Sequence, residues 1–274
     1  MNQLMELAPM ALWLVGAGVA GGLMAGLLGV GGGIVMVPVM ATIFQLMGMP
    51  NELIMHVAVA TSLAVIVPTG LSSARSHAKR GAVSKDLLLL WAPAMVVASF
   101  IGGISAGYYS AFVLRIIFGV MAFFIAVNSV VPLQKKLMSG LSASPITHRI
   151  SAAFIGYVSS LMGIGGGSLS VPTMTVLGSP VHTAVGTSSA LGVFIALPAA
   201  IGFIISGWNV ADLPQFSLGY VSLPAMASLA LGAILFAPVG AFIAHKLSAT
   251  LLKRVLAVYL LIVGTRMIIQ ALLG

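Results

Sequence analysis

Cysteine is absent from this chain of 274 residues, and charged side chains are scarce. The absence of cysteine excludes disulfides, thiolate metal sites and cysteine nucleophiles. Only 6% of the residues are charged, whereas soluble domains carry about 25%, so the chain could not cover a water-facing surface. The four carboxylates, Glu6, Glu52, Asp86 and Asp212, all lie in loops or at the ends of predicted segments. The middle of those segments therefore lacks the carboxylates that bind cations or relay protons in membranes.

Apolar sequence is abundant, since 60% of the residues are hydrophobic and the mean hydropathy is +1.17. Runs of roughly 20 apolar residues, enough for a helix to cross about 30 Å of hydrocarbon, recur along the chain. These runs do not alternate with polar residues, as the strands of a membrane barrel would. The pattern predicts an all-α polytopic membrane protein surrounded by a lipid bilayer. The predicted segments are 8–28, 34–48, 53–73, 87–107, 113–131, 150–164, 168–178, 182–206, 216–244 and 251–273.

The basic residues predict which loops face the cytoplasm. A net charge of +8 would suggest nucleic acid as the partner of a soluble protein. In a membrane protein, Lys and Arg instead collect in cytoplasmic loops, so no nucleic-acid partner is expected. The basic stretches 75–86, 132–149 and 245–254 are therefore predicted to be cytoplasmic loops of a protein in the cell (inner) membrane. The stretch 207–215 contains no Lys or Arg and is predicted to be external.

A ten-residue element occurs twice in the chain. Gly29–Pro38 (GVGGGIVMVP) returns 134 residues later as Gly163–Pro172 (GIGGGSLSVP). A second pair, His56–Ser62 and His182–Ser188, is separated by 126 residues. Several matches in the same order indicate a duplicated protein. The predicted parts are a first membrane repeat at 1–131, a basic cytoplasmic linker at 132–149 and a second membrane repeat at 150–274.

The two repeats are predicted to have opposite orientations. The loop 75–86 of the first repeat and the loop 207–215 of the second occupy corresponding places, yet they are predicted on opposite sides of the membrane. This requires an odd number of crossings in each repeat. Many secondary transporters consist of such inverted repeats, with a binding site near the midplane. The segments after the glycines are short and contain proline, so we expect broken or re-entrant helices there.

The paired motifs resemble those of a known family. The two Gly-(Val/Ile)-Gly-Gly-Gly-x-x-x-Val-Pro elements, the two Ala-Val-(Ala/Gly)-Thr-Ser segments and the basic loop after the first of these segments are similar to the sulfite exporter TauE/SafE family of permeases. The resemblance implies transport of sulfur-containing anions such as sulfite, sulfonates or sulfoacetate, or of other small organic acids. It does not fix the substrate, because members of the family are diverse.

The glycine elements are the main candidate site. If helices begin at Ile34 and Ser168, their free N–H groups and positive dipole ends face the preceding glycines, which suits an anion. Close helix packing is the alternative role for such glycines. A phosphate loop is excluded, because neither element is followed by Lys-Ser/Thr and no strand precedes it. The predicted glycine contacts to substrate are Gly29, Gly31, Gly32, Gly33, Gly163, Gly165, Gly166 and Gly167.

Polar side chains near these elements extend the candidate site. Hydroxyls in apolar helices can bind anion oxygens or satisfy a neighbouring carbonyl, and both roles stay open. The predicted hydroxyl contacts are Thr61, Ser62, Ser168, Ser170, Thr187 and Ser188. His56 and His182 are candidates for proton coupling or anion contact, although both could instead be interfacial residues. Helix breaks are predicted at Pro38, Pro68, Pro172 and Pro198, where the repeats would rock against each other.

These features predict a secondary transporter, permease or exporter of small anions. An anion channel of the same architecture and a transporter of small carboxylates are the alternatives. An enzyme is not expected, because the chain lacks a Gly-x-Ser-x-Gly motif, a midspan aspartate pair and a metal-ligand cluster. Neither a cofactor nor a metal is predicted. The sequence leaves open the direction of transport, the coupling ion and whether the protein is a homo-oligomer.

Overall fold

The computed structural model describes residues 13–23, 32–131, 133–138, 140, 142–244 and 249–273. Two predicted site residues, Gly29 and Gly31, lie outside this part of the chain. The same is true of residues 245–248 in the third predicted cytoplasmic loop.

Helices form nearly all of the described chain, which confirms the prediction of an all-α polytopic membrane protein. Within the described residues, five helices are long and apolar enough to cross a membrane, namely α3 (Asn51–Lys79), α4 (Lys85–Ala106), α5 (Ala111–Val130), α9 (Val181–Ser206) and the part Arg254–Leu273 of α11 (Ala249–Leu273). The others are a helix over Trp13–Leu23, α2 (Gly33–Leu46), α6 (Leu133–Leu137), α7 (Pro145–Met162), α8 (Gly167–Val176) and α10 (Leu223–Ala244). An antiparallel hairpin of β1 (Ser217–Leu218) and β2 (Val221–Ser222) precedes α10.

Two predicted helix starts were wrong. The segment expected to begin at 216 starts with the β hairpin, because Phe216 and Gly219 have φ angles of 59° and 51° that turn the chain away from a right-handed helix. The segment expected at 150 begins five residues earlier, at Pro145. There the side chain of Ser144 accepts a hydrogen bond from the Thr147 amide at 3.2 Å, and proline fits the first helical turn.

The four prolines predicted as helix breaks lie inside α2, α3, α8 and α9, and each helix continues through its proline. The interruptions of helical structure occur at glycines instead. Gly32, Gly163 and Gly166 have φ angles of 70°, 71° and 72°, a left-handed conformation that side-chain-bearing residues rarely adopt. A role for the prolines in movement stays a prediction.

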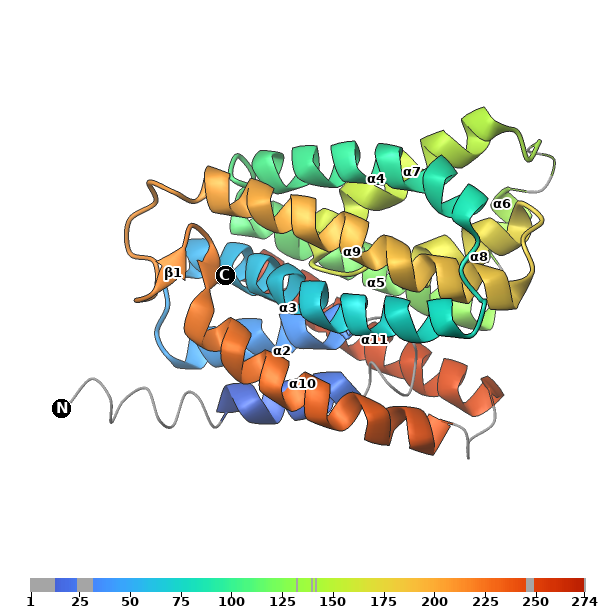
Figure 1. Ribbon diagram of the computed structural model, residues 1–274. Helices are drawn as coiled ribbons and strands as arrows, with labels where there is room; N and C mark the ends of the chain where they lie inside the picture. The colour runs from blue at the N-terminus through green and yellow to red at the C-terminus, as the bar shows by residue number, and fades with distance from the viewer. Residues whose placement is uncertain are drawn as a thin grey trace.

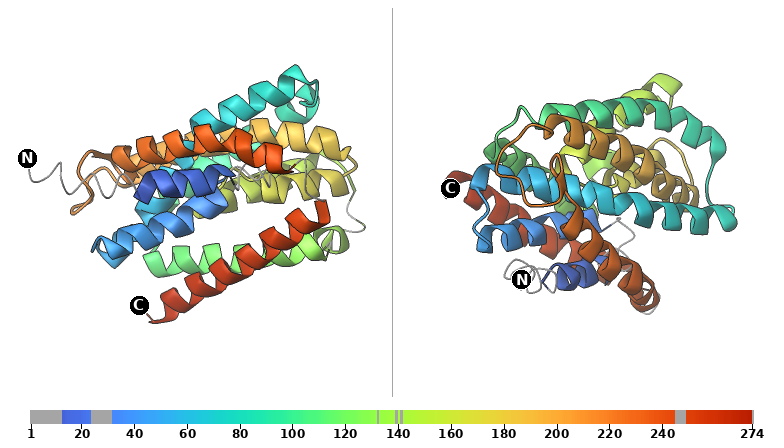
Figure 2. Two further views of the ribbon diagram at one scale, coloured as in Figure 1. Left: turned by 90° about the horizontal axis from the view of Figure 1, so that it is seen from below. Right: turned by 60° about the vertical axis from the view of Figure 1, so that its left-hand side comes forward.

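The long helices run between two ends of the bundle (Figure 1). The β hairpin and the loop after α4 lie at one end, on the left, which we call the hairpin end. The linker helix α6 and the loop between α3 and α4 lie at the other, the linker end. α3 and α5 run from the hairpin end to the linker end, and α4, which connects them in the sequence, runs back from the linker end to the hairpin end. α9 and α11 run the opposite way, with α10 returning (Figures 1 and 2).

The two helices that follow the glycine elements are too short to cross. α2 has 14 residues and α8 has 10, which at 1.5 Å per residue gives about 21 Å and about 15 Å. α2 ends at the hairpin end, where α3 begins, and α8 ends at the linker end, where α9 begins. Each therefore starts near the middle of the bundle and runs outward to a different end. Inverted repeats with re-entrant helices require this arrangement, although the repeat itself stays a prediction.

Helices from the two sequence halves alternate in space. α4 packs against α7 and α9, α3 packs against α9, and α5 packs against α11. Small residues allow the closest of these contacts, since a Cβ on Gly202 would lie 2.8 Å from the carbonyl oxygen of Phe100. A Cβ on Gly103 would likewise overlap the carbonyl oxygen of Ala199. Close approach of this kind gains the dispersion energy that holds helices together in lipid.

Two matched hydrogen bonds connect the halves. The backbone amide of Ser222, before α10, donates to Thr61 Oγ1 of α3 at 3.1 Å. The backbone amide of Ser84, before α4, donates to Thr187 Oγ1 of α9 at 3.0 Å. Thr61 and Thr187 are equivalent in the predicted repeat, and both are fully buried. Each half therefore supplies the acceptor for an amide at the start of a helix in the other half, and we name these two bonds the crossed threonine bonds.

Loss of a crossed threonine bond should destabilise the protein. Thr61→Val leaves the buried Ser222 amide without its acceptor, which costs about 1–3 kcal/mol, and Thr187→Val leaves the half-buried Ser84 amide without its acceptor, which costs less. The expected result is a lower thermal unfolding midpoint in detergent for both variants. Thr69→Val is the control, because Thr69 Oγ1 donates only to carbonyls of its own helix. Equal midpoints for all three variants would contradict the proposed role of the crossed bonds.

Candidate functional site

The starts of α2 and α8 have the same local structure. Gly32 and Gly166 precede these helices in the left-handed conformation, and no described side chain caps either glycine. The amides of the third and fourth residues of each helix donate to the carbonyl oxygen of the preceding glycine. In α2 these are Val35 and Met36, each 3.0 Å from the Gly32 oxygen. The amides before them, on residues 33–34 and 167–168, have no carbonyl within their own helices to bind. No described residue accepts a hydrogen bond from these amides, so both helix starts present donors and the positive end of a helix dipole.

The two glycine elements meet in the interior. Ser62 Oγ of α3 donates to the carbonyl oxygen of Gly163 at 2.8 Å. A Cβ on Gly33 would overlap that same carbonyl oxygen. A Cβ on Gly163 would lie 3.0 Å from the Cα atom of Val59. Gly33 and Gly163 are thus required for the close contact, so the packing role that the sequence left open is real for these two residues.

The start of α8 lies beside hydroxyls that have no partner. Ser159, in the last turn of α7, is fully buried, and its Oγ lies 3.3 Å from the position of a Cβ on Gly166. Among the described residues, the buried Oγ atoms of Ser159, Ser168 and Ser188 have no hydrogen-bond partner. A buried unpaired hydroxyl costs free energy, so Ser159 and Ser168 at the start of α8 favour a polar ligand there. Ser188 lies one turn before Gly192 of α9, whose Cβ would be 3.3 Å from the carbonyl oxygen of Gly165. We call Ser159, Ser168 and Ser188 the unpaired serines.

The other predicted hydroxyls already have partners in this conformation. Ser170 Oγ donates to the Gly166 carbonyl of its own helix at 2.8 Å. Thr61 and Thr187 accept the crossed threonine bonds, and Ser62 binds Gly163. These four hydroxyls are hydrogen-bonded to backbone groups in this conformation, as the structural role would require, and a role in substrate binding stays a prediction.

Ser159 was missed by the sequence-based reasoning. It lies before the repeated element, and the corresponding position 134 residues earlier is occupied by Ala25, so the repeat gave no signal. The available signal was the dipeptide Ser159-Ser160 in an apolar run directly before the glycines. The two serines have different roles, because Ser160 Oγ donates to the carbonyl oxygen of Tyr157 at 2.6 Å.

The two predicted histidines have unlike surroundings. His56 is only 4% exposed, and its ring lies between backbone carbonyl oxygens and the ring of Tyr220. His182 is exposed at the start of α9, at the linker end. The structure therefore does not bring the histidines together with each other or with the glycine elements. The described residues include no group of three His, Cys, Asp or Glu side chains placed to hold a metal ion.

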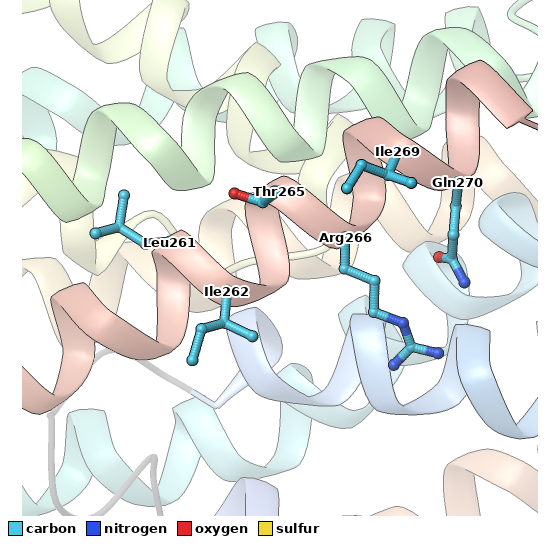
Figure 3. Close-up of a pocket in the computed structure, with 6 residues that line it drawn as sticks. All are labelled: Leu261, Ile262, Thr265, Arg266, Ile269 and Gln270. Carbon is cyan, nitrogen blue, oxygen red and sulfur yellow. The ribbon is translucent and has the colours of Figure 1, made fainter.

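An open groove of about 490 Å³ lies away from the glycine elements, along α11 (Figure 3). Its lining includes Arg266, whose side chain extends from the helix beside exposed apolar residues. The lining residues are Leu261, Ile262, Thr265, Arg266, Ile269 and Gln270. None of the predicted substrate contacts belongs to this groove, and an apolar, open depression on an outer helix suits lipid chains better than an anion.

A multi-helix bundle with apolar outer faces and two half-length helices meeting inside it defines a multi-pass membrane permease. The chain belongs to the sulfite exporter TauE/SafE family, whose sequence profile matches residues 14–267. Membership implies a small-molecule substrate and a lipid bilayer as surroundings, and it confirms the family resemblance drawn from the motifs. No solved structure matches the chain.

Similar proteins are named as transporters. A probable membrane transporter protein of Haemophilus influenzae is 33% identical over 257 residues, covering 94% of this chain and 97% of its own length. A probable membrane transporter protein of Bacillus subtilis is 26% identical over 94% of this chain and 97% of its own. One of Methanocaldococcus jannaschii is 27% identical over 90% of this chain and 91% of its own. The similarity spans both sequence halves.

The contact between the glycine elements predicts that alanine destabilises the protein at Gly33 but not at Gly165. Gly33→Ala places a methyl group against the Gly163 carbonyl, and overpacking of this kind costs about 1–3 kcal/mol. Gly165→Ala is the matched control, because its Cβ would have ordinary contacts of 3.5 Å to Ile66 and 3.7 Å to Gly192. Thermal unfolding of both variants in detergent should show a lower midpoint for Gly33→Ala alone. Equal tolerance of both would contradict the contact.

Proposed function

We propose that this protein is a secondary transporter of small anions, with a preference for sulfur-containing anions such as sulfite, sulfonates or sulfoacetate. The anion would bind where α2 and α8 begin. The proposal rests chiefly on one observation, which is that the starts of α2 and α8 meet through Gly33 and Gly163, with the unpaired Ser159 and Ser168 beside the start of α8. The family description, which names a sulfite exporter, supports the choice of substrate class.

Electrostatics favour an anion over a cation at this place. Each helix start carries the equivalent of about half a positive charge, and the two act on the same region. Backbone amides and hydroxyls donate hydrogen bonds, and a sulfite or sulfonate group offers three oxygens to accept them. The three carboxylates of the described chain, Glu52, Asp86 and Asp212, lie in the first turn of a helix or in a loop. Sodium bound by backbone carbonyls would need acceptors, whereas this region offers mainly donors.

The arrangement of the two short helices supports a cycle in which the site opens to one end of the bundle at a time. We infer two inverted membrane repeats, at 1–131 and 150–274, joined by the linker 132–149. α2 separates the site from the hairpin end, and α8 separates it from the linker end. Movement of either short helix, with its proline, would expose the site to one side at a time. In this scheme the linker end is cytoplasmic and the membrane is the cell (inner) membrane.

Two related functions are alternatives to this proposal. An anion channel of the same architecture would give flux that does not saturate and cannot accumulate substrate against a gradient. A transporter of small carboxylates would use the same donors, because a carboxylate also accepts hydrogen bonds through its oxygens. Uptake of sulfite, sulfoacetate, taurine, thiosulfate and simple carboxylates into proteoliposomes separates these functions, since only a carrier saturates and couples to a gradient.

The unpaired serines provide a direct test. Ser159→Ala, Ser168→Ala and Ser188→Ala remove hydroxyls that bond to no described group, so the unfolding midpoint without ligand should not fall. Each hydroxyl lost from a charged ligand costs about 1.5–3 kcal/mol, so sulfite should bind about tenfold more weakly or worse. Ligand-induced thermal stabilisation measures this affinity, because a ligand that binds only the folded form raises its stability.

The control for this test is Ser160→Ala. Ser160 is also fully buried and adjacent to Ser159, but its hydroxyl donates to Tyr157 and faces Gly102 of α4. This variant should lose some stability and keep the affinity for sulfite. Unchanged affinity in the triple serine variant, with sulfite binding intact in the wild type, would disprove the site.

A further inference from the structure

The ring of His56 is surrounded by acceptors. His56 lies in the second turn of α3, at the hairpin end. Its Nδ1 atom lies 2.9 Å from the carbonyl oxygen of Glu52. Its Nε2 atom lies 3.1 Å from the carbonyl oxygen of Ala106 and 3.0 Å from that of Tyr109. All three partners are backbone oxygens, which can accept a hydrogen bond but cannot donate one.

Such surroundings distinguish between the two charge states of histidine. A neutral imidazole has one N–H donor and one nitrogen lone pair, while an imidazolium has two N–H donors. With carbonyl oxygens on both sides, the neutral ring would direct its lone pair at an oxygen lone pair. Only the protonated ring can donate from both nitrogens at once. Both ring nitrogens can therefore be hydrogen-bonded here only when the His56 ring carries a second proton.

The neighbouring elements support a positive ring. Ala106 is the last residue of α4, so Nε2 lies at the negative end of a helix dipole, where a cation is favoured. The ring of Tyr220 stacks on His56 with centroids 4.8 Å apart and planes inclined by 26°. Burial raises the pKa of Tyr220, so its phenol stays neutral while histidine titrates. Burial disfavours the charged form of His56, whereas the carbonyl oxygens and the C-terminal end of α4 favour it.

The remaining titratable groups near His56 lie on α3, α5, α7 and the loop after α4. Glu52 is one turn earlier on α3, and the guanidinium of Arg115 on α5 is close enough for the two charges to attract. Tyr109, in the loop after α4, shares a hydrogen bond of 2.7 Å with the hydroxyl of Tyr157 on α7. That hydrogen bond is the main cause that raises the pKa of Tyr109. The Tyr109 phenol therefore stays neutral while histidine titrates, and the acidic and basic side chains on these elements are Glu52 and Arg115.

We propose that His56 is a proton-binding site of the transporter, and that its bound proton clamps α3 to the end of α4 in this conformation. When the proton leaves, one side of the ring loses its hydrogen bond and the hairpin end is free to open. The proton would exchange with water at that end, so its movement is coupled to that of the anion. The coupling depends on the proposed transport function, whereas the proton site itself does not.

Another buried histidine shows the opposite arrangement and serves as a control. Nδ1 of His148 accepts a hydrogen bond from the indole Nε1 of Trp91 at 2.9 Å. Because the indole can only donate, Nδ1 must be unprotonated and the His148 ring neutral. His148 is 7% exposed, close to the 4% of His56. The two rings therefore differ in their hydrogen-bond partners while both are buried.

Solid-state NMR of the protein in lipid, prepared with isotope-labelled histidine, tests the proton site. The signals that disappear in His56→Gln and His148→Gln assign the two rings. At about pH 5.5, below the ordinary histidine pKa of about 6.5, both nitrogens of His56 should be protonated while Nδ1 of His148 is not. At about pH 8.5, His56 should lose one proton and the contact to either Glu52 or α4. An unprotonated His56 nitrogen at both values would overturn the proposal.

Transport of radiolabelled sulfite in proteoliposomes tests the coupling. His56→Gln should lose the component of flux that a pH gradient drives and should keep sulfite–sulfite exchange, because exchange needs no net proton movement. His148→Gln should keep both. If the wild type exchanges sulfite but His56→Gln still responds fully to the gradient, the coupling role is wrong. If the wild type shows no exchange, the proposed substrate fails, and the NMR result still decides the proton site.

Discussion

The structure depends on how backbone hydrogen bonds are satisfied where there is no water. In the apolar interior of a bilayer an unpaired N–H or C=O group costs several kcal/mol, so helices normally cross without interruption. α2 and α8 begin inside the bundle, which leaves their first amides without helical partners. The left-handed glycines, the close contact of Gly33 with Gly163 and the bond from Ser62 surround those amides with protein. Irregular backbone is tolerated at this depth only where protein or a polar cavity encloses it.

The main features of the fold followed from the sequence because they depend on pattern. Apolar runs, Gly and Pro positions and basic loops predicted the long helices, and the paired GGG elements predicted two interruptions. The contact between Gly33 and Gly163 brings the two elements together in the interior. The start of α10 was placed too early, because an apolar stretch such as 217–222 reads equally well as a strand or as a helix. Only the positive φ angles around it decide between them.

The details of the site depend on partners far away in sequence, and these could not be predicted. Ser159 has no counterpart in the other half, so symmetry did not single it out. The surroundings of His56 come from carbonyls 50 and 53 residues further along, where backbone oxygens carry no signature in the sequence. Its repeat partner His182 is exposed, so equivalent positions have different environments. The substitution of Ile34 and Met36 by Ser168 and Ser170 makes the second element the more polar of the two. The two elements thus share a left-handed glycine at the start of a short helix and differ in the side chains around it.

The crossed threonine bonds have a consequence for how the protein is made. Ser84 and Thr187 are 103 residues apart, and Thr61 and Ser222 are 161 residues apart. A ribosome adds about 5–20 residues each second, so the amide of Ser84 waits for seconds before its acceptor is synthesised. During that time the first half lacks the packing of α9 against α3 and α4. The first half therefore cannot reach its final packing until the second half has been inserted beside it.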